Sequence, residues 1–201
     1  TQTGFYKGKK ITVISTGIGT DNIDIVLNEL DALVNVNFET REIKKHHHSL
    51  NIIRIGTSGG IQPHMKVDSF LMSEAGIGFD GLLHYYKNTI ENYEVTEALC
   101  KHLQLSSKKP KPYTVDADKK LMDLFKSEKD LFSGFTSTNL GFYGPQGRTL
   151  RLQLQDPKFI DQLVDFKIND KTITNLEMET SAIYALSKLL GHKALSMNAI
   201  I

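Results

Sequence analysis

The stretch Asn51-Ile52-Ile53-Arg54-Ile55-Gly56-Thr57-Ser58-Gly59-Gly60 decides the fold class. Its β-branched first half, Asn51–Ile55, predicts a strand that is covered on both faces. Its second half, Gly56–Gly60, predicts a loop at the carboxyl end of that strand. Because ligands bind at the carboxyl ends of the strands in open α/β sheets, this loop is a candidate binding site.

Arg54 is unusual in such an apolar run, because a buried guanidinium is costly unless an anion meets it. One interpretation is an internal salt bridge to Asp or Glu, and Arg54 alone does not decide between this and an external anion. The adjoining loop favours a bound phosphate or carboxylate, since its glycines let backbone N–H groups approach an anion and its hydroxyls add donors. It is no P-loop, because no Lys follows the glycines in the required register.

Outward from this stretch, strands and helices alternate along the chain. This pattern predicts an α/β fold: one domain, residues 1–201, with a mixed, mostly parallel central sheet flanked by helices. The expected strands are Ile11–Ser15, Asn51–Ile55, Val67–Ser73, Phe132–Thr138 and Thr172–Leu176, and helices are expected near 23–34, 95–103 and 118–126, after Asp156-Pro157, and over Met178–Leu190.

Two further clusters follow predicted strands. In Glu177-Met178-Glu179, the acids could simply favour a helix N-terminus, or a carboxylate could accept hydrogen bonds from sugar hydroxyls while Met packs on the sugar. In the segment Phe142–Arg148, Gln146 and Arg148 could present donors and an acceptor to a flat heterocycle on which Phe142 stacks. The alternative for that segment is an ordinary Gly-Pro turn.

The composition narrows the class of protein. A net charge of +1 over 201 residues gives no general attraction to nucleic acid or to an anionic membrane. One cysteine, Cys100, excludes an internal disulfide framework and fits a cytoplasmic protein, and no apolar run approaches the ~20 residues of a membrane span. His46-His47-His48 could bind metal, but a solvated loop is favoured, and no metal site is predicted. The apolar residues at both ends suggest that flanking elements of the fold lie outside this sequence.

The three clusters, in this order, resemble the nucleoside phosphorylase family that contains uridine phosphorylases and hexameric purine nucleoside phosphorylases. The Phe-Tyr-x-x-Gln-x-Arg pattern is similar to the uridine branch. The resemblance implies that Arg54, Gly56 and Thr57 bind phosphate; that Thr57, Glu177, Met178 and Glu179 hold ribose; and that Phe142, Gln146 and Arg148 hold the base, with Gln146 and Arg148 also catalytic. The family's upstream phosphate loop and its subunit-crossing arginine cannot be placed in this chain.

The function that this resemblance implies is phosphorolysis of uridine to uracil and ribose 1-phosphate. Inorganic phosphate would be the co-substrate, with no other cofactor, and the protein would form homodimers or hexamers. Departing uracil carries negative charge, which Arg148 and Gln146 would stabilise better than the neutral ground state. Two alternatives stay open: a purine nucleoside phosphorylase, and a non-catalytic protein that binds a nucleoside or base.

Overall fold

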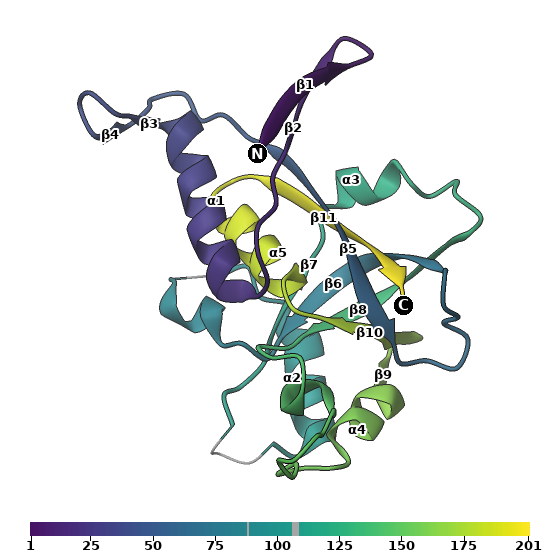
Figure 1. The fold of residues 1–201 in the computed structure, drawn as a ribbon. Coiled ribbons are helices and arrows are strands. Elements are labelled where there is room, and N and C mark those ends of the chain that lie inside the picture. Colours follow the sequence, from purple (N-terminus) through teal and green to yellow (C-terminus); the bar gives the residue numbers. More distant parts are fainter. Residues whose placement is uncertain (88, 106–108) are drawn as a thin grey trace.

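Strand β5 (Asn51–Gly60) carries Arg54 through the centre of a mixed sheet in a computed structural model that describes residues 1–87, 89–105 and 109–201 (Figure 1). In this part of the chain the sheet has seven strands, in the order β11-β5-β10-β8-β6-β7, with β9 paired to β10. The other sheet strands are β6 (Phe70–Gly78), β7 (Tyr113–Asp116), β8 (Leu131–Thr138), β9 (Lys167–Ile168), β10 (Lys171–Glu177) and β11 (Lys193–Ile200).

The strand directions are mixed, as expected, but parallel pairs do not dominate. β5–β11, β10–β8 and β8–β6 are parallel, whereas β5–β10, β6–β11 and β6–β7 are antiparallel. Because β11 pairs with β6 as well as with β5, the strands β5, β10, β8, β6 and β11 form a closed circuit of hydrogen-bonded neighbours. This closure encloses the side chains on the inner face of the circuit.

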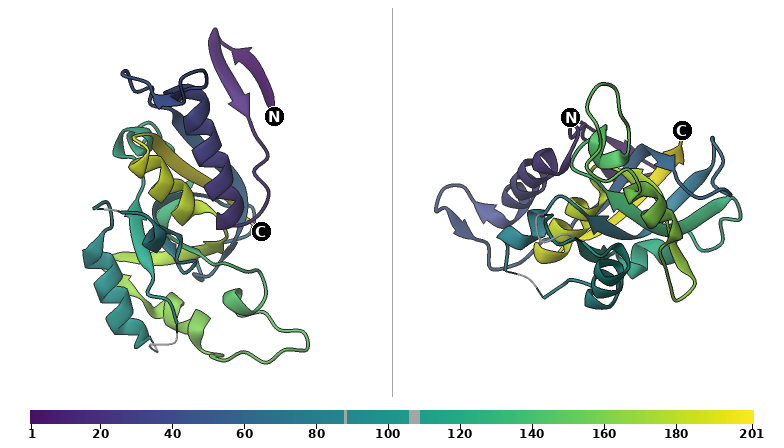
Figure 2. Two further views of the ribbon diagram at one scale, coloured as in Figure 1. Left: turned by 90° about the vertical axis from the view of Figure 1, so that its left-hand side faces the viewer. Right: turned by 90° about the horizontal axis from the view of Figure 1, so that it is seen from below.

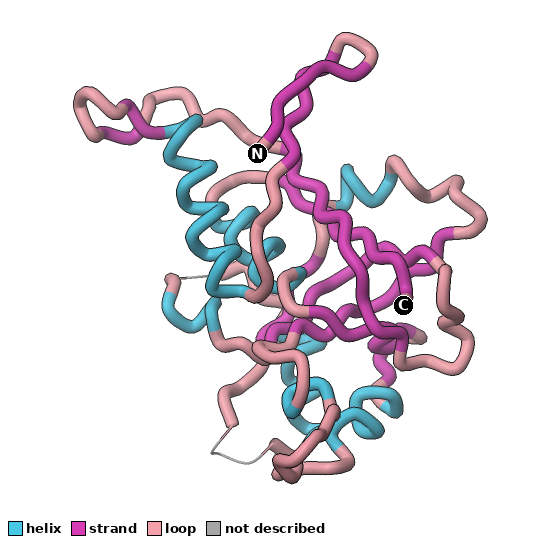
Figure 3. Tube along the Cα trace, in the orientation of Figure 1, coloured by secondary structure: helices cyan, strands magenta, loops and turns pink. Residues whose placement is uncertain are grey.

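Helices cover the sheet on two sides (Figures 2 and 3). α1 and α5 pack side by side over one apolar core, which includes Ile23, Leu27, Tyr184 and Leu195. α2 and α4 cover a second core, which includes Leu99 and Leu163. The helices are α1 (Thr20–Asn35), α2 (Tyr93–Leu103), α3 (Lys119–Asp123), α4 (Phe159–Asp165) and α5 (Thr180–Leu189), with short 3-10 turns at Leu82–Tyr85 and Gly144–Gln146.

The interior of the strand circuit is polar. Arg54, Gly56 and Ser58 alternate along the inner face of β5 and lie opposite Ser196, Asn198 and Ile200 of β11. The buried hydroxyl and amide groups bond to one another instead of to water, so burying them leaves few unpaired groups. The chain of hydrogen bonds joins Ser58, Asn175, Thr136, Ser73 and Asn198 and ends at Arg54.

Two predictions about the strands are wrong. The residues Gly56–Gly60 are not a loop, because they continue β5, and Gly59 and Gly60 pair with β10. Nor is β5 covered on both faces, since Ile55 on its outer face is 85% exposed.

The predicted strand Ile11–Ser15 lies outside the central sheet. It forms instead as β2 (Lys9–Val13), paired with β1 (Gln2–Tyr6) in an exposed hairpin that projects from the body of the molecule (Figure 1). A second short hairpin, β3 (Val36–Asn37) with β4 (Glu42–Ile43), lies between α1 and the three consecutive histidines. Among the described residues, no helix has the length and apolar character needed to cross a bilayer.

The hydroxyl of Tyr184 closes the circuit where β6 and β11 separate. It donates to the carbonyl oxygen of Ser73 at 2.6 Å and accepts from the backbone N–H of Ser196 at 2.8 Å. The β6–β11 ladder ends at the pair Met72 and Met197, and Ser73 follows Met72 while Ser196 precedes Met197. The phenol therefore replaces a ladder bond at this point.

We predict that Tyr184→Phe lowers the free energy of unfolding by about 1–3 kcal/mol, because two buried backbone groups lose their partner. Urea denaturation measures this loss. Tyr85→Phe is the matched control, since Tyr85 is 87% exposed and should unfold like the parent. Equal midpoints for the two variants would show that the hydroxyl bridge contributes nothing.

Candidate functional site

The ends of two neighbouring parallel strands bring the sequence clusters together. Thr138, the last residue of β8, pairs in register with Glu177, the last residue of β10. The segment Phe142–Arg148 follows β8, while Glu177 ends β10 and is followed by Met178 and Glu179. Both clusters therefore lie at the same edge of the sheet, as expected for strands that run in the same direction.

Arg54 reaches this edge from β5 and meets both carboxylates. Its Nη2 donates to Oε2 of Glu179 at 2.7 Å and lies 3.2 Å from Oε2 of Glu177. Its Nη1 donates to Oδ1 of Asn198 at 2.7 Å. The side chain is only 12% exposed. The internal salt bridge that the sequence allowed is thus present, and the acids that form it are the ones predicted to hold ribose.

The glycine at position 56 is required by this arrangement. A Cβ at Gly56 would lie 2.7 Å from the guanidinium of Arg54, so any side chain there would displace it. Gly56 therefore makes room for the arginine. Thr57, by contrast, lies opposite Ala199 on the outer face of β5, where its side chain is exposed. The structure does not bring the Thr57 hydroxyl to Arg54.

Glu177 is the buried anchor of the cluster, 4% exposed. Its Oε1 accepts from the hydroxyl of Thr138 at 2.6 Å. Its Oε2 accepts the backbone N–H groups of Glu179 and Thr180 at 2.8 and 2.9 Å, which are free donors at the start of α5. Burial raises the pKa of Glu177, and the positive charge of Arg54 opposes that rise. Both oxygens are thus engaged by the chain itself.

Glu179 connects the site to the N-terminal glycine turn. While its Oε2 holds Arg54, its Oε1 accepts the backbone N–H of Gly19 at 2.7 Å. Gly19 has φ of 98°, a conformation that favours glycine, and it precedes α1. Met178, between the two acids, is half-buried. The turn at Gly19 thereby fixes the direction of the Glu179 carboxylate.

The segment Phe142–Arg148 forms a second, tightly organised cluster. Nη1 of Arg148 donates to Oε1 of Gln146 at 2.5 Å and to the carbonyl oxygen of Phe142 at 2.9 Å. The guanidinium carbon lies 4.1 Å from the centroid of the Phe142 ring, close enough for a cation–π contact. Gln146 is 6% exposed and Phe142 is 53% exposed. The cluster therefore offers an exposed ring beside a buried amide and a fixed cation.

Asn139 and Gly59 connect the two clusters. The backbone N–H of Asn139 donates to the carbonyl oxygen of Glu177 at 2.9 Å, and its side chain donates to the carbonyl oxygen of Pro145 at 2.8 Å. A Cβ at Gly59 would lie 3.5 Å from Nη2 of Arg148. β5 thus places Arg54 beside the acids and Gly59 beside Arg148, and the three predicted clusters form one continuous site.

The sequence analysis missed several residues that shape this site. Asn198 and Ser196 orient Arg54, and the alternation of polar with apolar residues in Leu195–Asn198 could have indicated them. Thr138 carries no such signal, because its role depends on contacts with residues far away in the sequence.

A cavity of about 350 Å³ lies elsewhere, at the outer face of β5. Its lining is mainly apolar and includes Ile55, Phe70, Phe125 and Met197. It has no cation to hold an anion, so the chemistry of the Arg54 cluster does not belong to it.

Comparison with known proteins agrees with this geometry. A sequence model described as the phosphorylase superfamily matches residues 1–201. The chain is 29% identical over 198 residues to a uridine phosphorylase of Thermococcus kodakarensis, covering 96% of this chain and 58% of that protein. It is 27% identical over 199 residues to a DeoD-type purine nucleoside phosphorylase of Listeria welshimeri, covering 97% of this chain and 64% of that protein.

A solved structure supports the same relationship. A Trypanosoma brucei nucleoside phosphorylase that shows uridine phosphorylase activity superposes with a TM-score of 0.85 and 30% identity, covering 99% of this chain and 72% of that one. The chain thus spans about 60% of the length of the curated relatives it matches. Because that family model matches all of residues 1–201, this chain belongs to the phosphorylase superfamily.

Proposed function

We propose that this chain forms the nucleoside-binding part of a uridine phosphorylase, which transfers ribose from uracil to inorganic phosphate. The observation that supports this best is the pair Gln146 and Arg148. A buried amide held by a guanidinium 2.5 Å away is suited to the carbonyl and N–H groups along one edge of uracil. A purine presents a different set of groups along its edge.

In this proposal, the chemistry needs no covalent intermediate with the protein. A phosphate oxygen attacks C1′ of the ribose, the bond from C1′ to N1 of uracil breaks, and the electron pair leaves with the base. Negative charge then develops on the uracil ring. Arg148 is held by its contacts with Gln146 and Phe142, so it would stabilise the departing anion without first having to reorganise.

The Arg54 cluster would bind the sugar and one side of the phosphate. The carboxylate of Glu179 accepts hydrogen bonds. Ribose hydroxyls can therefore donate to it in place of the backbone N–H of Gly19, or together with that N–H. Arg54 would turn one N–H edge toward the phosphate while Asn198 retains the other. One arginine beside two carboxylates supplies too little positive charge for a phosphate dianion. We therefore expect further cationic groups from a second subunit or from residues outside this sequence, and the roles of Gly56 and Thr57 stay predictions.

The first prediction is that the purified protein releases uracil from uridine only when phosphate is present, because phosphate is the nucleophile. Chromatography of the reaction with and without phosphate measures this. Equal rates in the two reactions would indicate a nucleosidase. Uracil binding by calorimetry with neither phosphate binding nor turnover would indicate a non-catalytic binding protein.

The second prediction concerns the base. Gln146→Ala combined with Arg148→Ala should greatly reduce kcat/KM for uridine, because each hydrogen bond to a charged group contributes about 1.5–3 kcal/mol. Arg151→Ala is the matched control, since Arg151 is exposed and lies three residues further along. If inosine is the better substrate and the double variant retains its activity with inosine, the purine alternative replaces the uridine one.

The third prediction concerns stability and pH. Arg54→Met should lower the free energy of unfolding by about 3–5 kcal/mol, because it leaves two buried carboxylates without their cation. Burial already raises the pKa of Glu177 above its ordinary value of 4.5, and removing Arg54 raises it further. A carboxyl group whose pKa is raised in the folded state stabilises the fold at pH values below its ordinary pKa. This stabilisation is lost as the pH rises through the pKa of the folded state.

The loss in Arg54→Met should therefore be larger at pH 8 than at pH 5. Urea denaturation at both values measures the difference, with Arg151→Met as the control for removing an exposed arginine. A loss of stability that does not change with pH would mean that the carboxylates do not depend on Arg54.

A further inference from the structure

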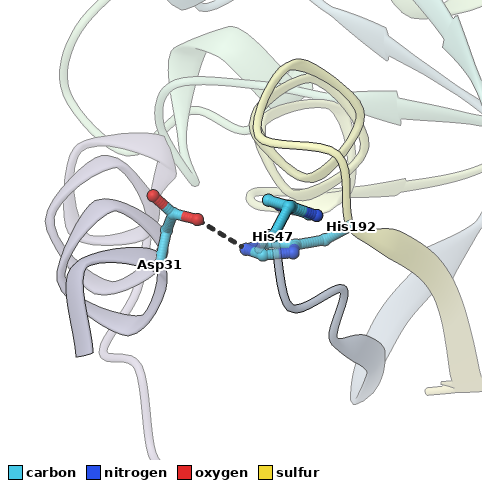
Figure 4. A group of neighbouring side chains, drawn as sticks. All are labelled: Asp31, His47 and His192. Atoms are coloured by element: carbon cyan, nitrogen blue, oxygen red, sulfur yellow. Dashed lines mark ion pairs between the residues drawn. The ribbon is translucent and has the colours of Figure 1, made fainter. Parts of the chain in front are cut away.

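We propose that Asp31, His47 and His192 form a binding site for a divalent transition-metal ion, with Zn²⁺ as the representative ion. Three separate parts of the chain contribute one residue each (Figure 4). Asp31 lies on α1, His47 lies in the loop before β5, and His192 follows α5. A carboxylate oxygen and two imidazole nitrogens suit Zn²⁺, which binds such ligands in tetrahedral sites.

The distance between His192 and Asp31 fits a shared ion, with His47 close by. One ligand atom of each residue lies within 4.8 Å of the other two. Nε2 of His192 is 3.2 Å from Oδ1 of Asp31. With metal–ligand bonds of about 2.0–2.2 Å, two atoms 3.2 Å apart subtend an angle of about 100° at the ion, close to the tetrahedral value.

His192 points a buried nitrogen into this space. Its side chain is 0% exposed, and Nε2 has no hydrogen-bond partner, because the nearby Asp31 oxygen is close but not aligned with the ring N–H. A buried polar atom without a partner costs about 1–3 kcal/mol, so this nitrogen calls for an explanation.

The contacts of His47 leave one of its nitrogens free for an ion. Its Nε2 lies 2.9 Å from the carbonyl oxygen of Leu190, which can only accept, so Nε2 carries the proton. Nδ1 of His47 then holds the lone pair. A second ring nitrogen that donates to a backbone carbonyl is the usual outer-shell support of a metal-binding histidine. The two imidazole rings face each other at 5.6 Å, and the exposed His47 ring must turn for both nitrogens to meet one ion.

The loop that carries His47 is held against the body of the protein. The imidazole of His47 sits over Gly191, where a Cβ would lie 2.9 Å from the ring. Ser49 donates to the carbonyl oxygen of Gly191 at 2.8 Å, and the N–H of His48 donates to Asn35 on α1 at 2.7 Å. The three consecutive histidines lie in an exposed loop, as predicted, and His47 is the one directed at the cluster.

Metal binding has one structural cost that can be observed. Nδ1 of His192 accepts the backbone N–H of Leu50 at 3.2 Å. An ion on Nε2 moves the ring proton to Nδ1, where it faces that N–H, so Leu50 must shift away. We therefore expect the amide resonance of Leu50 to change when metal binds.

The site would act on stability, not on the phosphorylase reaction. It joins α1, the loop and the connection from α5 to β11, and Leu50 is about 13 Å along the chain from Arg54 at ~3.3 Å per residue. An ion that binds only the folded state stabilises it by mass action. The inference is thus independent of the proposed function, and failure of one leaves the other standing.

The test is a calorimetric titration of the chelator-treated protein with Zn²⁺, followed by thermal unfolding with and without Zn²⁺. We expect one ion per chain, a higher Tm with Zn²⁺, and no comparable binding of Mg²⁺, which prefers oxygen ligands. His47→Ala and Asp31→Asn should each weaken Zn²⁺ binding at least 10-fold. His46→Ala is the matched control, an exposed histidine one residue away, and should bind like the parent.

Three results would overturn the proposal. The first is the absence of stoichiometric Zn²⁺ binding, and the second is unchanged Zn²⁺ affinity in both His47→Ala and Asp31→Asn. The third is a loss of Zn²⁺ affinity in His46→Ala as large as in His47→Ala, because that would indicate binding to exposed histidines in general. Because His47 is exposed, its variant should fold normally, and circular dichroism checks this for each protein. An unchanged Leu50 amide resonance on binding would exclude His192 as a ligand.

Discussion

The buried guanidinium of Arg54 is the constraint on which the rest of the site depends. A positive charge in the wall of a strand circuit must be matched, and this chain matches it with Glu177 and Glu179 on one side and Asn198 on the other. These partners come from the end of β10 and from β11. Their positions are therefore fixed by the closed pairing of the sheet, and the charge in turn requires that closure.

The polar interior extends the same constraint through the fold. Serine, threonine and asparagine side chains join the inner faces of the five strands, and almost all of them find partners within the chain. Such a network fixes one register, since a shift of one residue would move every inner side chain to the outer face. The register that satisfies the network also puts Gly56 under the guanidinium and Gly59 beside Arg148. Fold and site are thus specified by the same set of contacts.

In the proposed function, this arrangement would separate two tasks. The segment after β8 holds a flat, partly exposed surface with a fixed cation, suited to a base that leaves with negative charge. At the end of β10, the carboxylates of Glu177 and Glu179 meet Arg54 of β5. This group is suited to sugar hydroxyls and one face of an anion. Glu177 has no free oxygen for either task, because its two oxygens accept hydrogen bonds from the first turn of α5 and from Thr138. It orients its neighbours, and the ribose contact that the family resemblance implied for it stays a prediction.

The sequence by itself determined the fold class, most helices and strands, and the three segments that meet at the site, because these follow from local periodicity, glycine positions and an arginine in an apolar run. It also identified the two competing partners of Arg54, an internal carboxylate or an external anion. Only the tertiary structure showed that Glu177 and Glu179 meet Arg54, that Gly56–Gly60 continue the strand and that Ile11–Val13 lie in an exposed hairpin. The polar strand circuit and the Asp31, His47 and His192 cluster could not be predicted either, because each joins residues that are far apart in the chain and carry no local signal of their pairing.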